Sequence, residues 1–366
     1  MSSTLWNYRN PVAVHAGAGS LAQLSERVGD RRTLLVTFPE AGPLGLLSRI
    51  EPLLGDRLVA VESDIRPNPD VSWIAPMYER LWREHADAEC IVALGGGSAI
   101  DCAKIMLVRT ANGRFDELMD ILEGRAPVPP EAGHRALIAV PTTAGTGSEV
   151  TPWATLWDQA GARKLSLHLP CTWPQAAIVD AALMCSLPAA TTLASGLDAL
   201  SHALESIWNK HRNPVSAALA MNAARAIVQT LPALMREPAR IDLREAMATA
   251  ALQAGMAFSN TKTALAHSLS YDVTLATGTA HGIACSFCLP KVMALAFGHD
   301  AAVDSQMLAV FGASDAQQAI SVLEDFLHSL GVSTDPADYG IAASEWQQRV
   351  QTALAGPRGQ NFIATP

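Results

Sequence analysis

The sequence lacks several features that would place it in common classes of protein. No apolar run approaches the roughly 20 residues that a transmembrane helix needs, and no basic amphipathic segment opens the chain. Basic residues are the minority, with 26 Lys and Arg against 35 Asp and Glu and a formal net charge of -9. This charge argues against nucleic acids and anionic membranes as partners. We therefore expect a cytoplasmic protein that acts on small molecules.

Two widespread catalytic patterns are also missing from the sequence. It contains no G-x-x-x-x-G-K-[ST], which disfavours a P-loop nucleotidase, and no G-x-S-x-G, which disfavours a serine hydrolase of the α/β type. Cysteines are few, and they are scattered through apolar segments, which is typical of reduced, buried thiols. Cys285 and Cys288 have the spacing of a redox or zinc motif, but the pair stands alone beside Leu289 and Pro290, so we interpret both as buried thiols.

The order of strand-like and helix-like patterns predicts two domains. Residues 33–38, 58–61, 90–94, 136–140 and 176–179 are short apolar runs separated by several helical stretches, which indicates a parallel sheet built from βαβ units. After Leu187 and Pro188, long stretches rich in Ala and Leu take over, such as 215–234 and 243–258. We predict an α/β, Rossmann-like dinucleotide-binding domain over residues 1–187 and an all-helical metal and substrate domain over residues 188–366.

Two glycine-rich loops follow strands of the predicted sheet. The first contains Gly95, Gly96, Gly97 and Ser98 and leads into a helix whose first turn contains Asp101. Glycines let the backbone approach a diphosphate closely, and the helix start offers free N–H groups. The second loop, Pro-Thr-Thr-Ala-Gly-Thr-Gly-Ser-Glu over residues 141–149, brings hydroxyl groups to the same edge. Either loop alone is typical of a plain turn, but the two together predict dinucleotide binding.

A third glycine pattern is interpreted differently. Residues 17–22, Gly-Ala-Gly-Ser-Leu-Ala, formally satisfy the dinucleotide pattern G-x-G-x-x-A. The run before it is interrupted by Pro11 and His15, and the strand after it ends in Phe38 and Pro39 with no Asp at its tip. We interpret this segment as a turn that leads into a helix.

Four side chains in the second half predict a metal centre. Asp198 and His202 are four residues apart, so on a helix they lie on one face. His267 and His281 are fourteen residues apart, about 21 Å along an unbroken helix, so they reach one ion only if the helix breaks. Residues 274–279, with Gly278, favour that break. One histidine alone is more often a core residue, but one carboxylate with three imidazoles suits Fe²⁺, or alternatively Zn²⁺.

With these residues assembled, the chain resembles the iron-containing (group III) alcohol dehydrogenase family. The matching elements cover roughly residues 5 to 295 and occur in the family's order. They are Pro67-Asn68-Pro69, Gly-Gly-Gly-Ser-x-x-Asp-x-x-Lys at 95–104, Pro-Thr-Thr-x-Gly-Thr-Gly-Ser-Glu at 141–149, Ser186-Leu187-Pro188, Gly196-Leu197, Asp-Ala-Leu-Ser-His-Ala-Leu-Glu at 198–205, His267 and His281-Gly282.

The resemblance implies an NAD(P)-dependent enzyme whose active site lies in a cleft between a nucleotide-binding domain and a helical metal domain. Asp198, His202, His267 and His281 match the metal ligands. Gly96, Gly97, Ser98, Asp101, Thr142, Thr143, Thr146, Ser148 and Lys164 match cofactor contacts. We also expect a homodimer.

Three departures from the family pattern bear on specificity. Phe38 stands where the family often has an Asp that binds the adenosine ribose, so we expect either NAD(H) or NADP(H). Tyr271, followed by Asp272, replaces a histidine that many members carry, and both are candidate proton relays.

Lys262 lies five residues before His267, and Arg358 and Asn361 are available in the tail to join it. A surface lysine is one interpretation; if Lys262 instead points inward, its burial requires an anion, which indicates an anionic substrate. The pattern is similar to the phosphonoacetaldehyde reductase branch.

We therefore predict a metal-dependent NAD(P)H oxidoreductase that interconverts an aldehyde and a primary alcohol, with phosphonoacetaldehyde and 2-hydroxyethylphosphonate as the favoured pair. The alternatives are a general short-chain alcohol dehydrogenase and a maleylacetate-reductase-like enzyme. A dehydroquinate-synthase-like lyase has the same two-domain plan but is disfavoured by Asp198, where a glutamate is expected. A binding module that has kept the fold is disfavoured by the four ligands and two nucleotide loops.

Overall fold

The structure is a computed structural model that describes residues 5–130, 132–161 and 163–365. It divides the chain into two compact units. The sheet unit comprises Pro11–Thr143 and Ser148–Ser186, and the helical unit comprises residues 5–10, 144–147 and 187–365. This division differs from the predicted bounds of 1–187 and 188–366 at residues 5–10, 144–147 and 187, which cluster with the helices. Tyr8, for example, donates a hydrogen bond to the carbonyl of Met256.

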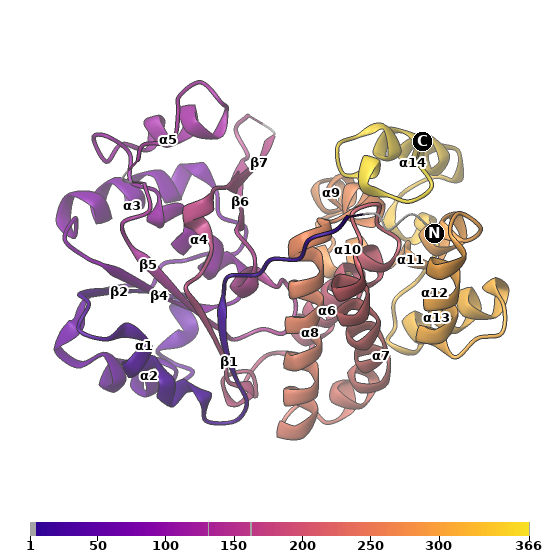
Figure 1. Ribbon diagram of the computed structural model, residues 1–366, viewed down its shortest axis with the longest axis horizontal. Coiled ribbons are helices and arrows are strands. Elements are labelled where there is room, and N and C mark those ends of the chain that lie inside the picture. Colours follow the sequence, from indigo (N-terminus) through magenta and orange to yellow (C-terminus); the bar gives the residue numbers. More distant parts are fainter. Residues whose placement is uncertain (1–4, 131, 162, 366) are drawn as a thin grey trace. The chain divides into compact units, whose positions relative to one another are not determined.

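The sheet unit contains a six-stranded parallel sheet, which confirms the predicted fold class (Figure 1). Across the sheet the order is β1, β8, β5, β4, β2, β3. The strands are β1 (Ala13–Ala16), β2 (Thr33–Val36), β3 (Leu58–Glu62), β4 (Cys90–Gly95), β5 (Ala136–Pro141) and β8 (Ala176–Val179).

Helices cover both faces of this sheet. Alternate residues of the strands point to opposite faces, so Leu35 packs with α1 (Leu24–Val28) and α2 (Leu47–Leu54) on one face. Leu34 packs on the other face, where the helices are α3 (Val71–Glu84), α4 (Gly97–Leu107) and α5 (Phe115–Leu122). Because the central strands are buried on both faces, they are continuous apolar runs in the sequence.

The strand order creates a switch point beside β4. Strands β3 and β4 flank β2, and the helices that follow β2 and β4, namely α2 and α4, lie on opposite faces of the sheet. The connections therefore diverge at the carboxyl ends of β2 and β4 and leave a crevice, which is where open α/β sheets bind their ligands. Strand β4 ends at Gly95, so the first glycine loop lies at this position.

Three strands were not predicted from the sequence. Strand β1 is an edge strand that pairs with β8, and an edge position tolerates the nearby Pro11. Strands β6 (Trp153–Asp158) and β7 (Arg163–His168) form a separate antiparallel pair. The segment Gly17–Ala22 leads from β1 into the short 3-10 helix η1 (Ser20–Gln23) and then α1, in agreement with its interpretation as a turn into a helix.

The helical unit is built around three long helices that pack against one another, as Figure 1 shows. These are α6 (Ala189–Ile207), α7 (Pro214–Arg236) and α8 (Ile241–Thr261). The remaining helices are α9 (Leu265–Thr277), α10 (His281–Ser286), α11 (Leu289–Ala296), α12 (Ala301–Phe311), α13 (Ala316–Ser329) and α14 (Ala343–Ala355). They share one continuous apolar core. Within the described ranges, no helix combines the length and the apolar character needed to cross a membrane.

Candidate metal centre and cofactor loops

Helix α6 presents three chemically active side chains on one buried face. Asp198, His202 and Glu205 follow the spacing i, i+4, i+7, which aligns side chains along a helix. All three are nearly inaccessible, with exposed fractions of 4%, 5% and 0%. A buried carboxylate is costly unless cations or donors surround it, so this face requires partners from other helices.

Helices α9 and α10 supply the remaining imidazoles. Helix α9, which carries His267, ends at Gly278 in a left-handed conformation, and α10 begins at His281. The predicted break between the two histidines is therefore present. Asp198 Oδ1 lies 3.4 Å from His267 Nε2, 3.8 Å from His281 Nε2 and 3.7 Å from His202 Nε2. The structure thus brings together all four predicted metal ligands around one carboxylate oxygen.

The position of His281 depends on the close packing of α10 against α6. A Cβ atom on Gly282 would lie only 1.7 Å from the carbonyl oxygen of Ala194 in α6. Any larger residue at position 282 would push the two helices apart and carry His281 away from Asp198.

Glu205 holds His267 in place. Its Oε2 lies 2.7 Å from His267 Nδ1 and accepts a hydrogen bond from the Ala264 N–H at 2.8 Å, and its Oε1 accepts from the Ala266 N–H at 2.5 Å. Burial alone would lower the pKa of His267, but the carboxylates of Glu205 and Asp198 raise that pKa to about 9. With Nδ1 engaged by Glu205, the other ring nitrogen is the one that faces Asp198.

The donors present fit a metal ion. The Nε2 atom of His267, a residue 2% exposed, is buried and has no hydrogen-bond partner among the described residues. Burial lowers the pKa of His202 to about 4, so its imidazole is neutral at pH 7. Burial opposes ionisation of Asp198, but the imidazoles of His202, His267 and His281 hold its pKa well below the usual range. A carboxylate with imidazoles suits Fe²⁺ or Zn²⁺, and a bound ion would take the place of the proton that His267 holds at pH 7.

Converting Glu205 to glutamine is expected to lower metal affinity about 10- to 100-fold, the range usual for losing an outer-shell partner of a histidine ligand. The amide keeps the volume of the side chain but has one acceptor oxygen where the carboxylate has two. The hydrogen bond between His267 Nδ1 and residue 205 is therefore weaker. Competition with a chromophoric chelator measures the change. Glu324→Gln, on α13 of the same unit, is the matched control. An unchanged dissociation constant in Glu205→Gln would remove Glu205 from the metal centre.

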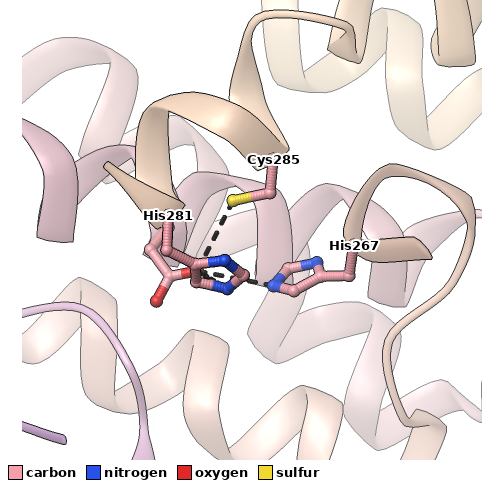
Figure 2. A group of neighbouring side chains, drawn as sticks. His267, His281 and Cys285 are labelled. Carbon is pink, nitrogen blue, oxygen red and sulfur yellow. Dashed lines mark hydrogen bonds and ion pairs between the residues drawn. The ribbon is translucent and has the colours of Figure 1, made fainter. Parts of the chain in front are cut away.

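Sequence reasoning assigned no role to Glu205 and interpreted Cys285 as a core thiol. The structure places Cys285 Sγ 3.6 Å from Asp198 Oδ1, and Figure 2 shows Cys285, His267 and His281 converging. The helical spacing of both residues indicated that they lie on the same helix face as a predicted ligand. Glu205 follows Asp198 by seven residues on α6, and Cys285 follows His281 by four residues on α10.

The cluster is open to solvent on the side of His281. The His281 side chain is 39% exposed, whereas those of Asp198 and His267 are 6% and 3% exposed. The ring of Tyr271 stacks on His281 with centroids 6.0 Å apart, and the Arg358 guanidinium carbon lies 4.8 Å from the Tyr271 ring centroid. Burial raises the pKa of Tyr271 to about 12, so its hydroxyl keeps its proton at pH 7. Asp272, the other candidate relay, is exposed.

Lys262 caps the C-terminal end of α8. Its φ is 65°, and its carbonyl accepts a hydrogen bond from Asn209 Nδ2. The exposed Lys262 lines a pocket of about 920 Å³ together with Lys210, His211 and Arg212. None of the four predicted metal ligands lines this pocket. The approach of Lys262 to the substrate stays a prediction. Asn361 uses its side-chain amide to bind the carbonyl of Thr263.

The first glycine loop has the backbone required for close approach to a ligand. Gly95 has φ 153°, and a Cβ there would lie 2.7 Å from Ala99 Cβ and 3.2 Å from the Phe38 ring. Gly96 precedes the first residue of α4, Gly97, so N–H groups at the start of α4 are directed to the switch point. Ser98 Oγ accepts a hydrogen bond from the Asn68 N–H at 3.2 Å.

A buried charge network joins the two predicted cofactor loops. Lys104 is fully buried, and its Nζ donates to Ser148 Oγ and to the carbonyl of Trp153, both at 2.7 Å. Ser148 Oγ donates to Asp101 Oδ1 at 2.6 Å, and Asp101 Oδ2 accepts from the Thr155 N–H. Burial lowers the pKa of Lys104 to about 8. Asp101 and Ser148, predicted as cofactor contacts, are thus engaged in holding the second loop.

The other predicted cofactor residues lie on the second loop and on the β6–β7 pair. The Thr142 N–H donates to the carbonyl of Gly95, and the Thr143 side chain lies against Gly96, so the two loops meet at neighbouring strand ends. Thr146 lies in the segment 144–147, which belongs to the helical unit. Lys164, on β7, has its ammonium 5.4 Å from the Trp157 ring centroid.

Comparison with known proteins agrees with this geometry. Residues 11–181 match the family model described as iron-containing alcohol dehydrogenase, and residues 192–365 match the C-terminal model of the Fe-containing alcohol dehydrogenase family. The chain is 32% identical over 362 residues to the NAD-dependent methanol dehydrogenase of Bacillus methanolicus, covering 95% of this chain and 93% of that protein. It is 30% identical over 370 residues to the 1,3-propanediol dehydrogenase of Klebsiella pneumoniae, covering 97% and 94%.

A solved structure with the same fold is the sulfoacetaldehyde reductase of Bifidobacterium kashiwanohense in complex with NAD⁺. It superposes with a TM-score of 0.89 at 28% sequence identity, covering 99% of this chain and 95% of that chain. The predicted cofactors, Fe²⁺ and NAD(H), fit these relatives. From the two matched models, the near full-length relatives and the convergent Asp and His side chains, we conclude that the chain belongs to the iron-containing alcohol dehydrogenase family and is an oxidoreductase of alcohols and aldehydes.

Proposed function

We propose that this enzyme uses Fe²⁺ and NADH to reduce a small aldehyde that carries an anionic group, with phosphonoacetaldehyde as substrate and 2-hydroxyethylphosphonate as product. The observation that carries this proposal is the guanidinium of Arg358, one aromatic ring away from His281 at the open side of the metal cluster. A relative with the same fold is a reductase of sulfoacetaldehyde, which is also an anionic aldehyde.

Arg358 has the properties of an anion receptor. It is partly buried, it contacts the face of Tyr271, and no carboxylate among the described residues forms an ion pair with it. The planar guanidinium offers several N–H donors that match the oxygens of a phosphonate or sulfonate. Stacking on Tyr271 fixes its orientation, so little side-chain entropy is lost when an anion binds.

The residues of the helical unit have defined tasks in the proposed reaction. Asp198, His202, His267 and His281 hold the metal ion, Glu205 orients His267, and Arg358 binds the anionic end of the substrate. When bound, the metal ion polarises the carbonyl oxygen and the reduced nicotinamide provides the hydride. Tyr271 covers one face of His281 and limits access of water there. Its raised pKa makes the hydroxyl a donor rather than a base at pH 7, so a proton relay through Tyr271 runs toward the product oxygen.

The sheet unit binds the dinucleotide in this proposal. Gly95, Gly96, Gly97 and Ser98 approach the diphosphate from the switch point, and Thr142, Thr143 and Lys164 complete the contacts of this unit. Thr146, on the segment 144–147, stays a predicted contact. Asp101, Ser148 and Lys104 keep the second loop in shape. Phe38 packs on Gly95 at the tip of β2, where a carboxylate would repel a 2′-phosphate. NADP(H) is therefore the alternative cofactor. We also propose a homodimer and a cytoplasmic location for this enzyme.

A second candidate function is the oxidation of small neutral alcohols. It is favoured by two relatives that are named for methanol and 1,3-propanediol, neither of which carries a charge. Such substrates would leave Arg358 without an anion. The two functions therefore differ in whether charge on the substrate matters.

The test follows NADH by its absorbance in the presence of Fe²⁺-loaded protein and three aldehydes, namely phosphonoacetaldehyde, sulfoacetaldehyde and uncharged propionaldehyde. A hydrogen-bonded charge contact is worth about 1.5 to 3 kcal/mol. We therefore expect kcat/KM to be about 10- to 100-fold higher for the anionic aldehydes. Equal or higher values for propionaldehyde would support the neutral-alcohol function. NADH that stays unoxidised with every aldehyde would reject both.

A further inference from the structure

Cys285 adds a sulfur to the ring of nitrogen and oxygen donors around Asp198. It follows His281 by four residues on α10, so both side chains lie on the same face of that helix. The donor atoms of Asp198, His267, His281 and Cys285 all lie within 4.8 Å of one another. Figure 2 shows the sulfur of Cys285 and the rings of His267 and His281 directed to one point.

We propose that Cys285 is a further ligand of the metal ion and binds it as a thiolate. This inference rests on the metal centre of the proposed function. As the sulfur–metal bond forms, the S–H bond breaks and its proton passes to water, so the charge of the centre falls by one. The ion then has a thiolate, a carboxylate and imidazoles as protein ligands, with His202 Nε2 3.7 Å from the shared carboxylate oxygen.

The distances fit a coordination sphere. Two ligand atoms of one ion, each at a bond length of about 2.0 to 2.3 Å, lie at most about 4.0 to 4.6 Å apart. The separations from Asp198 Oδ1 are 3.4 Å to His267 Nε2, 3.6 Å to Cys285 Sγ and 3.8 Å to His281 Nε2. All three separations are within the span of a single ion, and the two nitrogen–oxygen distances are longer than good hydrogen bonds between these atoms.

Burial and an unpartnered ring nitrogen distinguish this cluster from a chance grouping. His267 Nε2 is directed into the cluster and has no hydrogen-bond partner among the described residues, although it is buried. Cys285 is fully buried, and its thiol donates within the cluster to Asp198 Oδ1 at 3.6 Å and, alternatively, to the carbonyl of Gly282 at 3.4 Å. A single ion in the cluster would satisfy His267 Nε2 and would take the place of the thiol proton.

The consequence is a change in metal preference. Thiolate is a soft ligand and favours Zn²⁺ over harder ions, whereas carboxylate and imidazole alone accept Fe²⁺ readily. We therefore expect Cys285 to increase the affinity for Zn²⁺ relative to Fe²⁺. Replacing it by serine is expected to lower Zn²⁺ affinity at least about 10-fold, by analogy with the loss of other metal-site contacts, with a smaller change for Fe²⁺.

Cobalt substitution tests the proposal without reference to activity. Co²⁺ occupies sites built for Zn²⁺ or Fe²⁺, shows visible d–d bands for any protein ligand set, and shows an additional near-ultraviolet charge-transfer band only when a thiolate is bound. The experiment records both bands for the full-length protein and for Cys285→Ser, Cys288→Ser and His267→Ala. Cys288 lies three residues from Cys285 and is equally buried, but it is part of the apolar core of the helical unit.

We expect the charge-transfer band in the unmodified protein and in Cys288→Ser, and its loss in Cys285→Ser with the d–d bands retained. Visible bands without charge transfer in the unmodified protein would overturn the thiolate ligand and leave the metal centre intact. Charge transfer that persists in Cys285→Ser would also overturn it. Visible bands identical in the unmodified protein and in His267→Ala would instead count against the proposed metal centre itself.

Discussion

Replacing His267 by alanine is expected to abolish metal retention and to lower kcat/KM for every aldehyde at least about 1,000-fold. The variant loses Nε2 from the centre of the cluster, and Asp198 loses the nearest of its three imidazoles, 3.4 Å away. It also leaves the buried carboxylate of Glu205 without the ring nitrogen that it binds at 2.7 Å. Polarisation of a carbonyl by a metal ion is worth several kcal/mol, and each 1.36 kcal/mol corresponds to a factor of ten in rate.

The measurement combines metal analysis of the purified variant with NADH-coupled kinetics. Binding of NADH, followed by fluorescence, is expected to stay within about twofold of the unmodified protein because the glycine loop at Gly95–Gly97 belongs to the other compact unit. His299→Ala is the control, since His299 is an exposed residue of the helical unit. Retained metal with near-normal turnover in His267→Ala would remove this cluster from the mechanism.

The second large effect is expected at Arg358. Arg358→Ala should lower kcat/KM for phosphonoacetaldehyde about 100-fold, because the phosphonate loses its charge-assisted hydrogen bonds while it remains partly desolvated. The value for propionaldehyde should change no more than about threefold, since that substrate has no group for the guanidinium to bind. Steady-state kinetics with both aldehydes measures the difference, and the ratio of the two losses is the informative quantity.

Two further variants separate charge from packing. Arg358→Lys keeps the positive charge but loses the planar fork, so it should recover part of the rate on the phosphonate substrate. Lys262→Ala should have little effect on either aldehyde, because Lys262 lines a pocket that includes neither Arg358 nor any of the four metal ligands. Equal losses on both aldehydes in Arg358→Ala would mean that this residue acts only through its packing on Tyr271. A selective loss in Lys262→Ala would restore Lys262 as the anion receptor.

The strands that the sequence predicted well are those whose residue pattern is compatible with a single environment in the fold. Strands β2, β4 and β5 are buried on both faces, and only an uninterrupted apolar run satisfies that environment. Strand β1 was missed because it is a short edge strand with mixed exposure, beside Pro11. The β6–β7 pair was missed because each strand needs its partner to bury alternate residues, and that pairing is not visible within one segment.

Within the site, spacing along a helix predicted which side chains share a face but not which helices meet. Asp198 and His202 followed from a spacing of four, and the break before His281 followed from Gly278. The same spacing rules applied to Glu205 and Cys285, whose roles depend on how α9 and α10 pack against α6.

The role of Lys262 could not be derived from its distance of five residues from His267. The backbone at Lys262 has a positive φ of 65° between α8 and α9, and a distance in sequence gives no direction across such a turn.

The unequal exposure of the ligands also affects how the enzyme keeps its iron. Because Asp198 and His267 are shielded and His281 is not, exchange of the ion with the surrounding medium passes the edge of the His281 ring. We expect a substrate bound by Arg358 beside this edge to slow dissociation of the ion. Chelators should therefore remove iron more slowly while aldehyde is present than after it is depleted.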